Sequence, residues 1–470
     1  MELSSGTVWS KSYDLLRRLE IDHAVFFGLF AKLWTIIAGP VTLVLIARKF
    51  SPEIQGYYFT FATIVALQVF VELGLGTVIV QFAGHEWASL SLDGNGRIAG
   101  DRVALARLTS LAAIASRWYC VGSILFTAGL ATCGYMFLSS AQVDGVHWAA
   151  PWLSLCILSG LNLLLVPVWS LLEGCNQVAK LYTFRFVQGV LSAVTLWVAV
   201  LFNASLWTAS IGCVVTITSS ICYLRWHHAD FVKTLLLTES GKTNGKLLTW
   251  RHDLLPLQWR IAITMITSYF VFTFFVPVAF KFKGPVVAGQ IGMTWAAINA
   301  LGNLSFSWFT PKVPRLCALI AAGKYEERDK LFFHNIAIVM VLLLGAGMAL
   351  WGGIWVINHL GLAISKRLLP PGAAGIFIAA NMVLFASSPF SQYMRAHKRE
   401  PIVFVVVCTS VLTGISTLMT GKYGSMGLMM GNYLIINFVA TAAIVRIWFR
   451  FRAGRRWGED NEILPRQIRA

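Results

Sequence analysis

Charge is scarce in this sequence. Only 13% of its 470 residues are Asp, Glu, Lys or Arg, whereas 57% are apolar, and apolar runs of about 20 residues recur from one end to the other. A chain with so little polar surface cannot fold around one core in water. The composition therefore excludes a soluble protein and predicts a polytopic membrane protein.

Long polar stretches are also missing, and we expect no removable signal. Residues 1–23 are polar and amphipathic, and we expect them to lie in the cytoplasm. The apolar run that follows carries Lys32 and has no small-residue cleavage site, so the first helix is expected to stay as an anchor. The longest polar stretches, 83–118 and 225–256, are too short to build much of a core. The first is predicted to hold an amphipathic surface helix, and the second to be a cytoplasmic linker.

The sequence also lacks the motifs of nucleotide and metal chemistry. Gly241 begins a GKT triplet, but Leu236 stands where a phosphate-binding loop needs its first glycine. The eight cysteines form no CxxC pair and lie within or beside apolar helices, where they are typical packing residues. We therefore expect no ATP site, no metal, no disulfide, no other cofactor and no catalytic residue.

Apolar windows of membrane-spanning length predict twelve helices. With the N-terminus in the cytoplasm, most Lys and Arg fall in inner segments and at inner helix ends, so both termini are predicted to be cytoplasmic. The basic tail, 446–470, then lies against anionic lipid headgroups, and no nucleic-acid partner is expected, because the basic residues form no single face. The predicted helices are 24–46, 57–82, 119–138, 149–172, 186–202, 206–224, 257–280, 286–310, 331–357, 373–393, 402–419 and 426–445.

An internal repeat divides these helices into two sets of six. The basic turns IARKFSPEIQG and VAFKFKGPVVAG each join one apolar helix to the next. Pro52 matches Pro285 and Gly56 matches Gly289, both at an offset of 233 residues. Six spans return the chain to its starting side, so duplication gives parallel repeats around a central cavity. The predicted organisation is an N-lobe at 24–224, the linker at 225–256 and a C-lobe at 257–445.

Three charged residues are candidates for a substrate or coupling site at membrane depth. Lys32 and Glu72 fall at nearly one depth on consecutive antiparallel helices, so we predict that they pair. The pair is either structural or opens during transport, with Lys32 turning to the substrate and Glu72 taking up a proton or cation. Arg260, near the inner start of the seventh helix, either contacts a substrate phosphate or extends to the headgroups.

The eighth helix carries a polar face. Asn299, Asn303 and Ser307 recur every four residues, and such a face lines an aqueous cavity or hydrogen-bonds a neighbouring helix. Trp295 is a candidate for stacking on a sugar ring, although most of the 18 Trp are expected at lipid or interfacial positions. The substrate-binding or coupling candidates are Lys32, Glu72, Arg260, Gln290, Thr294, Trp295, Asn299, Asn303 and Ser307.

The segment SPEIQGYYFTFATIVALQVFVELGLGTVIVQFAG, residues 51–84, resembles a family signature. It is similar to the first loop and second helix of polysaccharide and O-antigen flippases in the multidrug/oligosaccharidyl-lipid/polysaccharide exporter superfamily. In that pattern a Ser-Pro-Glu turn and a Gly precede a helix whose acidic residue, here Glu72, is followed by Leu-Gly-Leu. Residues 255–280 are similar to the second-half counterpart, whereas Gln81 replaces a residue that is basic in many relatives.

The resemblance implies a fold and a function. The fold would be an all-α polytopic membrane protein, with twelve transmembrane helices in two six-helix lobes around a central cavity that opens alternately to each side. The function would be non-enzymatic: moving a polyprenyl-diphosphate-linked oligosaccharide to the outer leaflet of the cytoplasmic (inner) membrane, for O-antigen, lipopolysaccharide or other surface polysaccharide biosynthesis. Whether a glycosyltransferase or polymerase partner is required stays open.

Two other classes of function remain. A multidrug or cation exporter of the same superfamily would share the architecture. A membrane glycan polymerase or ligase would need a large external loop with clustered catalytic groups, and the longest predicted outer loops, 139–148 and 358–371, are short. We rank the flippase first and the enzyme last.

Overall fold

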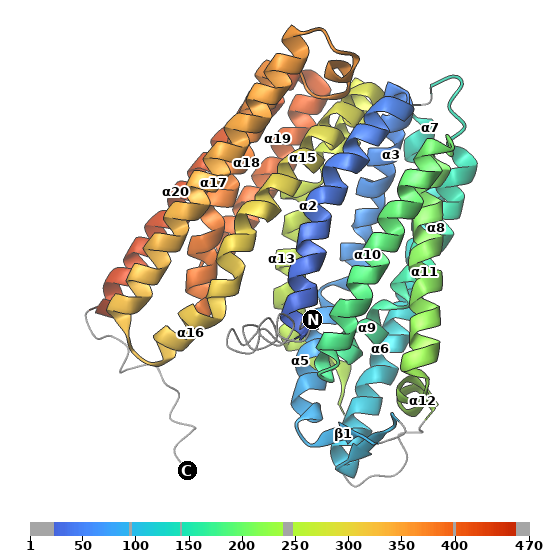
Figure 1. The fold of residues 1–470 in the computed structure, drawn as a ribbon, viewed down its shortest axis with the longest axis vertical. Coiled ribbons are helices and arrows are strands. Elements are labelled where there is room, and N and C mark those ends of the chain that lie inside the picture. The colour runs from blue at the N-terminus through green and yellow to red at the C-terminus, as the bar shows by residue number, and fades with distance from the viewer. Residues whose placement is uncertain (1–22, 94–95, 142, 238–247, 398–400, 457–470) are drawn as a thin grey trace, which may run out of the picture. The chain divides into compact units, whose positions relative to one another are not determined.

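The computed structural model describes residues 23–93, 96–141, 143–237, 248–397 and 401–456 (Figure 1). The chain forms two compact units: residues 1–54 with 64–265, and residues 55–63 with 266–470. The predicted N-terminal segment before residue 23, the middle of the predicted linker and most of the basic tail lie outside the described residues. The predicted domain boundaries stay predictions.

Both units are built from helices, most of them long. In the first unit these are α2 (His23–Lys49), α3 (Pro52–Val65, shared with the second unit), α4 (Val69–Glu72), α5 (Leu75–Trp87), α6 (Arg102–Gly129), α7 (Tyr135–Ser139), α8 (Ala149–Leu163), α9 (Val166–Gly174), α10 (Val178–Leu201), α11 (Trp207–His227), α12 (Ala229–Leu237) and most of α13 (Leu255–Phe272), with a hairpin of β1 (Leu90–Leu92) and β2 (Ile98–Gly100). In the second they are α14 (Phe275–Lys283), α15 (Pro285–Phe309), α16 (Val313–Ala321), α17 (Tyr325–His359), α18 (Pro371–Ala396), α19 (Val403–Tyr423) and α20 (Met426–Arg456).

Membrane-spanning helices account for most of the chain. Within the described residues, ten helices are long and apolar enough to cross a membrane. The helices α2 and α15, with 27 and 25 residues, have the length for two more spans. This confirms the predicted all-α polytopic membrane fold in two lobes.

The N-termini of α3 and α15 agree with the repeat seen in the sequence, which stays a prediction. Each helix begins at its matched proline, Pro52 or Pro285, where the missing N–H costs nothing. In α3 the hydroxyl of Ser51 also accepts a hydrogen bond from the amide of Ile54 at 3.2 Å, which is an N-cap. The Ser-Pro-Glu turn is therefore a helix start, with Glu53 at the positive end of the helix dipole.

Several sequence predictions about helices were wrong. The predicted helix 149–172 is divided into α8 and α9, and 257–280 is divided into α13 and α14. The predicted continuous helix 57–82 is interrupted, because Leu73 (φ 45°) and Gly74 (φ 70°) are left-handed and separate α4 from α5. The predicted surface helix in 83–118 is not separate either. It is the first half of one 38-residue helix that begins after the N-cap Asp101 and continues through a π turn to Ser139.

Aromatic side chains satisfy backbone carbonyls near four irregular points of the helices. A carbonyl that loses its helical partner in hydrocarbon has no water to bond, so protein must supply the donor. Indole and phenol groups supply it here, near the 3-10 turn after α3, the α4 break, the π turn after α6 and the break between α13 and α14. The pairs are Tyr269 with Thr63 O (3.2 Å), Trp118 with Val71 O (3.0 Å), Trp152 with Leu130 O (3.2 Å) and Tyr433 with Val271 O (3.2 Å).

A buried charge cluster ties α17 to α20 in the second unit. Asp329 accepts hydrogen bonds from Arg328 Nη2 at 2.9 Å and from Arg452 Nη2 at 2.7 Å. The Arg328 side chain is 1% exposed, and its guanidinium lies 4.9 Å from the ring centre of Tyr325 and 5.4 Å from that of Tyr393. One carboxylate thus partly compensates two arginines in an aromatic environment.

We expect Asp329→Asn to destabilise the chain by about 3 kcal/mol, because it leaves two arginines without their anion. The melting temperature of the purified protein in detergent measures this. Glu327→Gln is the matched control, because its 3.0 Å pair with Lys324 is exposed and should contribute less than about 1 kcal/mol. Equal shifts for the two variants would contradict the assignment.

A second prediction concerns His228, just beyond the span that α11 forms. Burial lowers the pKa of His228 to about 4, and the charges of Lys180 and His227 add to the effect. An unfolded His binds a proton near pH 6.5, so stability is lost as pH falls from about 6.5 towards 4. We expect His228→Phe, which keeps an aromatic ring near Tyr223, to lose less melting temperature than the wild type between about pH 7 and pH 5. A parallel decline in both proteins would refute this.

Candidate functional site

Glu72 is the last residue of the candidate membrane span Pro52–Glu72, at a break in the helical path of the chain. It is the last residue of α4, is half-buried, and directly precedes the left-handed pair Leu73 and Gly74. A Cβ at Gly74 would overlap the side chain of Ile261, so no larger residue fits there without a shift. The break therefore places an ionisable group beside the N-terminus of α5, where the helix dipole favours a negative charge.

Two neighbouring residues of α6 face this break. The Trp118 indole caps Val71 O and stacks on Trp250, with ring centres 5.4 Å apart. The Tyr119 side chain is fully buried, and its hydroxyl lies within electrostatic reach of Glu72. That hydroxyl lies near the backbone of Gly76, in the first turn of α5.

The chain supplies a further polar group on this side of the first unit. The indole of Trp250 donates to Gln258 Oε1 at 2.9 Å, and the Gln258 side chain is 2% exposed. Trp118, Tyr119 and Gln258 were not among the sequence candidates. In the sequence they appear only as aromatic or amide residues at membrane depth. The chain has 18 Trp and 12 Tyr, so this feature is too common to identify a site.

The other charged candidates are less constrained. The Lys32 side chain lies outside the part of the chain that is described, so its pairing with Glu72 stays a prediction. Arg260 is exposed, and its guanidinium lies 5.7 Å from the ring centre of its neighbour Trp259. Its guanidinium is thus exposed, and the predicted role of Arg260 stays a prediction.

Three of the α15 candidates are engaged with protein in the second unit. The Gln290 amide donates to Lys366 O at 3.0 Å, and the Thr294 hydroxyl accepts from the amide of Leu369 at 3.1 Å. Trp295 packs on Phe272, with ring centres 5.9 Å apart. These contacts give Gln290 and Thr294 a role in holding the segment after α17.

Further along α15 the polar face is open. Asn303 is exposed, Asn299 and Ser307 are half-buried, and the Ser307 hydroxyl donates to Asn303 O at 2.8 Å. Both amide side chains therefore remain available to a ligand or a neighbouring group. The structure places these residues in the second unit, whereas Glu72 and Arg260 belong to the first.

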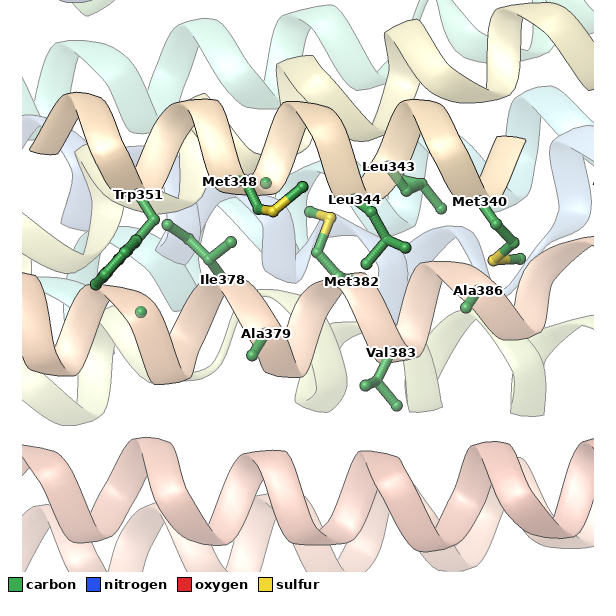
Figure 2. Close-up of a pocket in the computed structure, with 12 residues that line it drawn as sticks. Met340, Leu343, Leu344, Met348, Trp351, Ile378, Ala379, Met382, Val383 and Ala386 are labelled. Carbon is green, nitrogen blue, oxygen red and sulfur yellow. The ribbon is translucent and has the colours of Figure 1, made fainter. Parts of the chain in front are cut away.

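A groove of about 580 Å³ lies between α17 and α18 (Figure 2). Leu344 and Met348 of α17 face Met382 of α18 across it, and Trp351 closes one end. The Trp351 indole nitrogen donates to Pro371 O at 3.1 Å. Because its lining is apolar, this groove does not suit a charged headgroup, and none of the candidate residues lines it.

The matched glycines of the two repeats meet each other within the second unit. A Cβ on Gly289 would lie 2.9 Å from the backbone nitrogen of Gly56, and a Cβ on Gly56 would overlap the carbonyl of Pro285. The start of α3 therefore contacts α15 through backbone atoms. Gln55 strengthens this contact, because its amide nitrogen donates to Gly289 O at 2.9 Å and to Arg367 O at 3.0 Å.

The fold resembles those of solved transporters. A multidrug resistance MATE family transporter of the MOP superfamily, inward-facing, has a TM-score of 0.62 at 12% identity, with 91% of this chain and 96% of that chain covered. The lipid II flippase MurJ, in an inward closed conformation, has a TM-score of 0.59 at 13% identity, with 90% and 87% covered. The MATE multidrug transporter DinF-BH in complex with R6G has a TM-score of 0.59 at 12% identity, with 93% and 96% covered.

Neither the family models nor the curated proteins compared with this chain gave a match. At 12 to 13% identity the structural likeness establishes the fold and leaves the substrate open.

We expect Gly56→Ala to destabilise the protein by about 3 kcal/mol, because the added methyl group meets backbone atoms that no rotamer change can move. Gly431→Ala in α20 is the control, since no atom lies within 4 Å of the added group there, and it should leave stability unchanged or raise it by about 1 kcal/mol. Thermal unfolding of both purified variants checks this, and an unaffected Gly56→Ala protein would show that the close crossing is not formed.

Proposed function

We propose that this chain is a membrane transporter that moves a lipid-linked oligosaccharide from the inner to the outer leaflet by alternating access. The observation that carries the proposal is the position of Glu72. The acidic residue of the flippase-like signature is the last residue of the candidate span Pro52–Glu72, at a helix break, near half-buried Trp118 and buried Tyr119. Intramembrane carboxylates are costly, and they are typical of transport pathways and ion relays.

The break makes Glu72 suitable for coupling. An ionised carboxylate is favoured by the N-terminus of α5, and a protonated one loses that interaction. A change in its protonation, or in a bound cation, thus alters the electrostatic interaction between Glu72 and the start of α5, where the helix is already interrupted. In this proposal Lys32 pairs with the ionised Glu72, and it is released when Glu72 takes up the proton or cation.

The polar face of α15 suits the head of such a substrate. Asn299, Asn303 and Ser307 offer donors and acceptors for sugar hydroxyls, and Arg260 offers a cation for a diphosphate. Gln290, Thr294 and Trp295 support α15 and the segment over it, as their contacts indicate. The polyprenyl tail can stay in the lipid, so it needs no enclosed cavity.

The proposal places the chain in the cytoplasmic membrane, with both termini on the cytoplasmic side. The charge of +17, concentrated at one set of helix ends, supports that orientation. Surface polysaccharide synthesis, including O-antigen and lipopolysaccharide, is the proposed pathway class. Glycosyltransferases or a polymerase are the proposed partners, and no enzymatic activity is assigned to the chain.

A multidrug or cation exporter is the second candidate. It is favoured by the likeness to two MATE transporters, with TM-scores of 0.62 and 0.59, which equals the support that the flippase likeness gives. Deleting the gene separates the two functions. Lipid-linked oligosaccharide accumulating on the inner leaflet supports the flippase, and dye sensitivity with normal glycan export supports the exporter.

For the flippase we expect Glu72→Gln to lower glycan export roughly tenfold while folded protein stays in the membrane, because the coupling group is lost. Glu173→Gln is the matched control, since Glu173 lies in a 3.5 Å pair with Arg185 at a partly exposed position. Export is measured as surface glycan in cells that carry the variant as the sole copy. Normal export by Glu72→Gln would remove Glu72 from the mechanism.

The pairing of Lys32 with Glu72 is tested by exchanging the charges. Lys32→Glu combined with Glu72→Lys should restore folded protein if the side chains meet. Restored export would indicate a structural pair, and folded protein without export would indicate a coupling pair. A double variant that is no better folded than the single charge reversals would show that Glu72 has another partner.

A further inference from the structure

We propose that Gln55 is a positioning residue that latches α3 and the segment 366–369 onto the start of α15, and that release of its amide opens this end of the second unit. The inference rests on the proposed alternating-access function. It adds a gating residue that the sequence did not indicate. All of the groups involved belong to the second unit.

One amide group joins three parts of the chain. The Gln55 side chain is 1% exposed, and its nitrogen donates to Gly289 O in α15 at 2.9 Å. The same nitrogen donates to Arg367 O, in the segment after α17, at 3.0 Å. Both amide protons are therefore used, and loss of this group would release α15 and the segment together.

The segment that Gln55 holds is fixed by other bonds of the same kind. Gln290 donates to the carbonyl of Lys366, and Thr294 accepts from the amide of Leu369. These are bonds from side chains to backbone atoms, and they can break without repacking a core. Because Leu369 itself is buried, its amide is shielded only while the segment stays in place.

The backbone contact between Gly56 and Gly289, next to Gln55, has features that favour separation. The glycine pair Gly56 and Gly289 brings backbones together without interlocking side chains. Two polar atoms of α3 are buried without a hydrogen-bond partner in the described part of the chain: Gln55 Oε1 and Thr60 Oγ1. Burying an unpaired acceptor costs stability, and opening would hydrate both, so the closed contact is poised near the open one.

Further along α3, residues of α13 and α14 hold the helix through aromatic contacts and a hydrogen bond. Tyr57 packs edge-on against Phe280, with ring centres 5.0 Å apart, and Tyr269 donates to Thr63 O. The latch and the polar acceptors thus lie nearer the start of α3 than the Thr63 bond. Opening is expected to begin at Gln55.

Amide hydrogen exchange of the purified full-length chain in detergent tests the latch, because it reports local opening without needing a substrate. Gln55→Glu places a carboxylate against two carbonyl oxygens, and Gln55→Met removes both bonds at similar length. Each should speed exchange in peptides covering 366–369 and the start of α15 roughly five- to thirtyfold, the factor that two ordinary hydrogen bonds give an equilibrium.

The matched control is Gln188→Met, since Gln188 is an amide in the first unit that also donates to a backbone carbonyl, Thr216 O, at 3.0 Å. It should leave exchange at 366–369 unchanged. Unchanged exchange there in both Gln55 variants overturns the latch, as does an even rise across α17 to α20, which would mean general destabilisation. Hydrogen exchange measures no transport, so the latch would be seen whatever substrate the chain carries. A negative result in the glycan export assay therefore leaves the test of the latch unaffected.

Discussion

Backbone carbonyls in hydrocarbon have to find a donor within the protein, and much of this structure follows from that constraint. Regular helices meet it locally, so any irregularity needs a partner from another helix. The indole of Trp118 supplies one for the α4 break, and the phenol of Tyr433 supplies one before the break that separates α13 from α14. Aromatic residues with a polar edge suit this task because most of their surface is apolar. These hydrogen bonds fix the irregular points in place. At such points polar groups can be accommodated within an apolar helix.

The same constraint explains how a carboxylate is tolerated at Glu72. A continuous helix would offer this group only apolar neighbours, whereas the left-handed Leu73 and Gly74 open a helix end beside it. In the second unit, Gln55 and the glycine pair bring backbones together and join them through amide hydrogen bonds. The two arrangements are alike, since both rely on directed bonds to backbone atoms instead of bulk apolar packing.

The helical content and the repeat could be predicted from the sequence because both depend on patterns that repeat over many residues. Hydropathy integrates over a whole span, and Pro52 and Pro285 both mark real helix starts. The break at Leu73 could not be predicted in this way, because a single Leu-Gly pair is tolerated within many helices. The continuity of α6 was missed because its polar first half looked separate, although nothing after the Asp101 cap interrupts it.

The candidate site was predicted less completely. The polar face of α15 was visible from spacing, yet spacing could not show that Gln290 and Thr294 bond the segment 366–369. Gln55 was missed because an amide next to a helix start looks like ordinary interfacial polarity. Contacts between residues more than 200 positions apart, such as Gln55 with Gly289, depend on tertiary packing and have no local signal.

The cluster of Arg328, Asp329 and Arg452 also sets an order of events during biosynthesis. Asp329 and Arg452 are 123 residues apart, so α17 is made and begins to enter the membrane well before its partner in α20 exists. At a translation rate of about 5–20 residues per second, the delay is about 6 to 25 s. Throughout that interval Arg328 cannot occupy its buried, aromatic-lined position with the full set of contacts. The ion cluster of the second unit is therefore completed only after α20 has been made, well after α17.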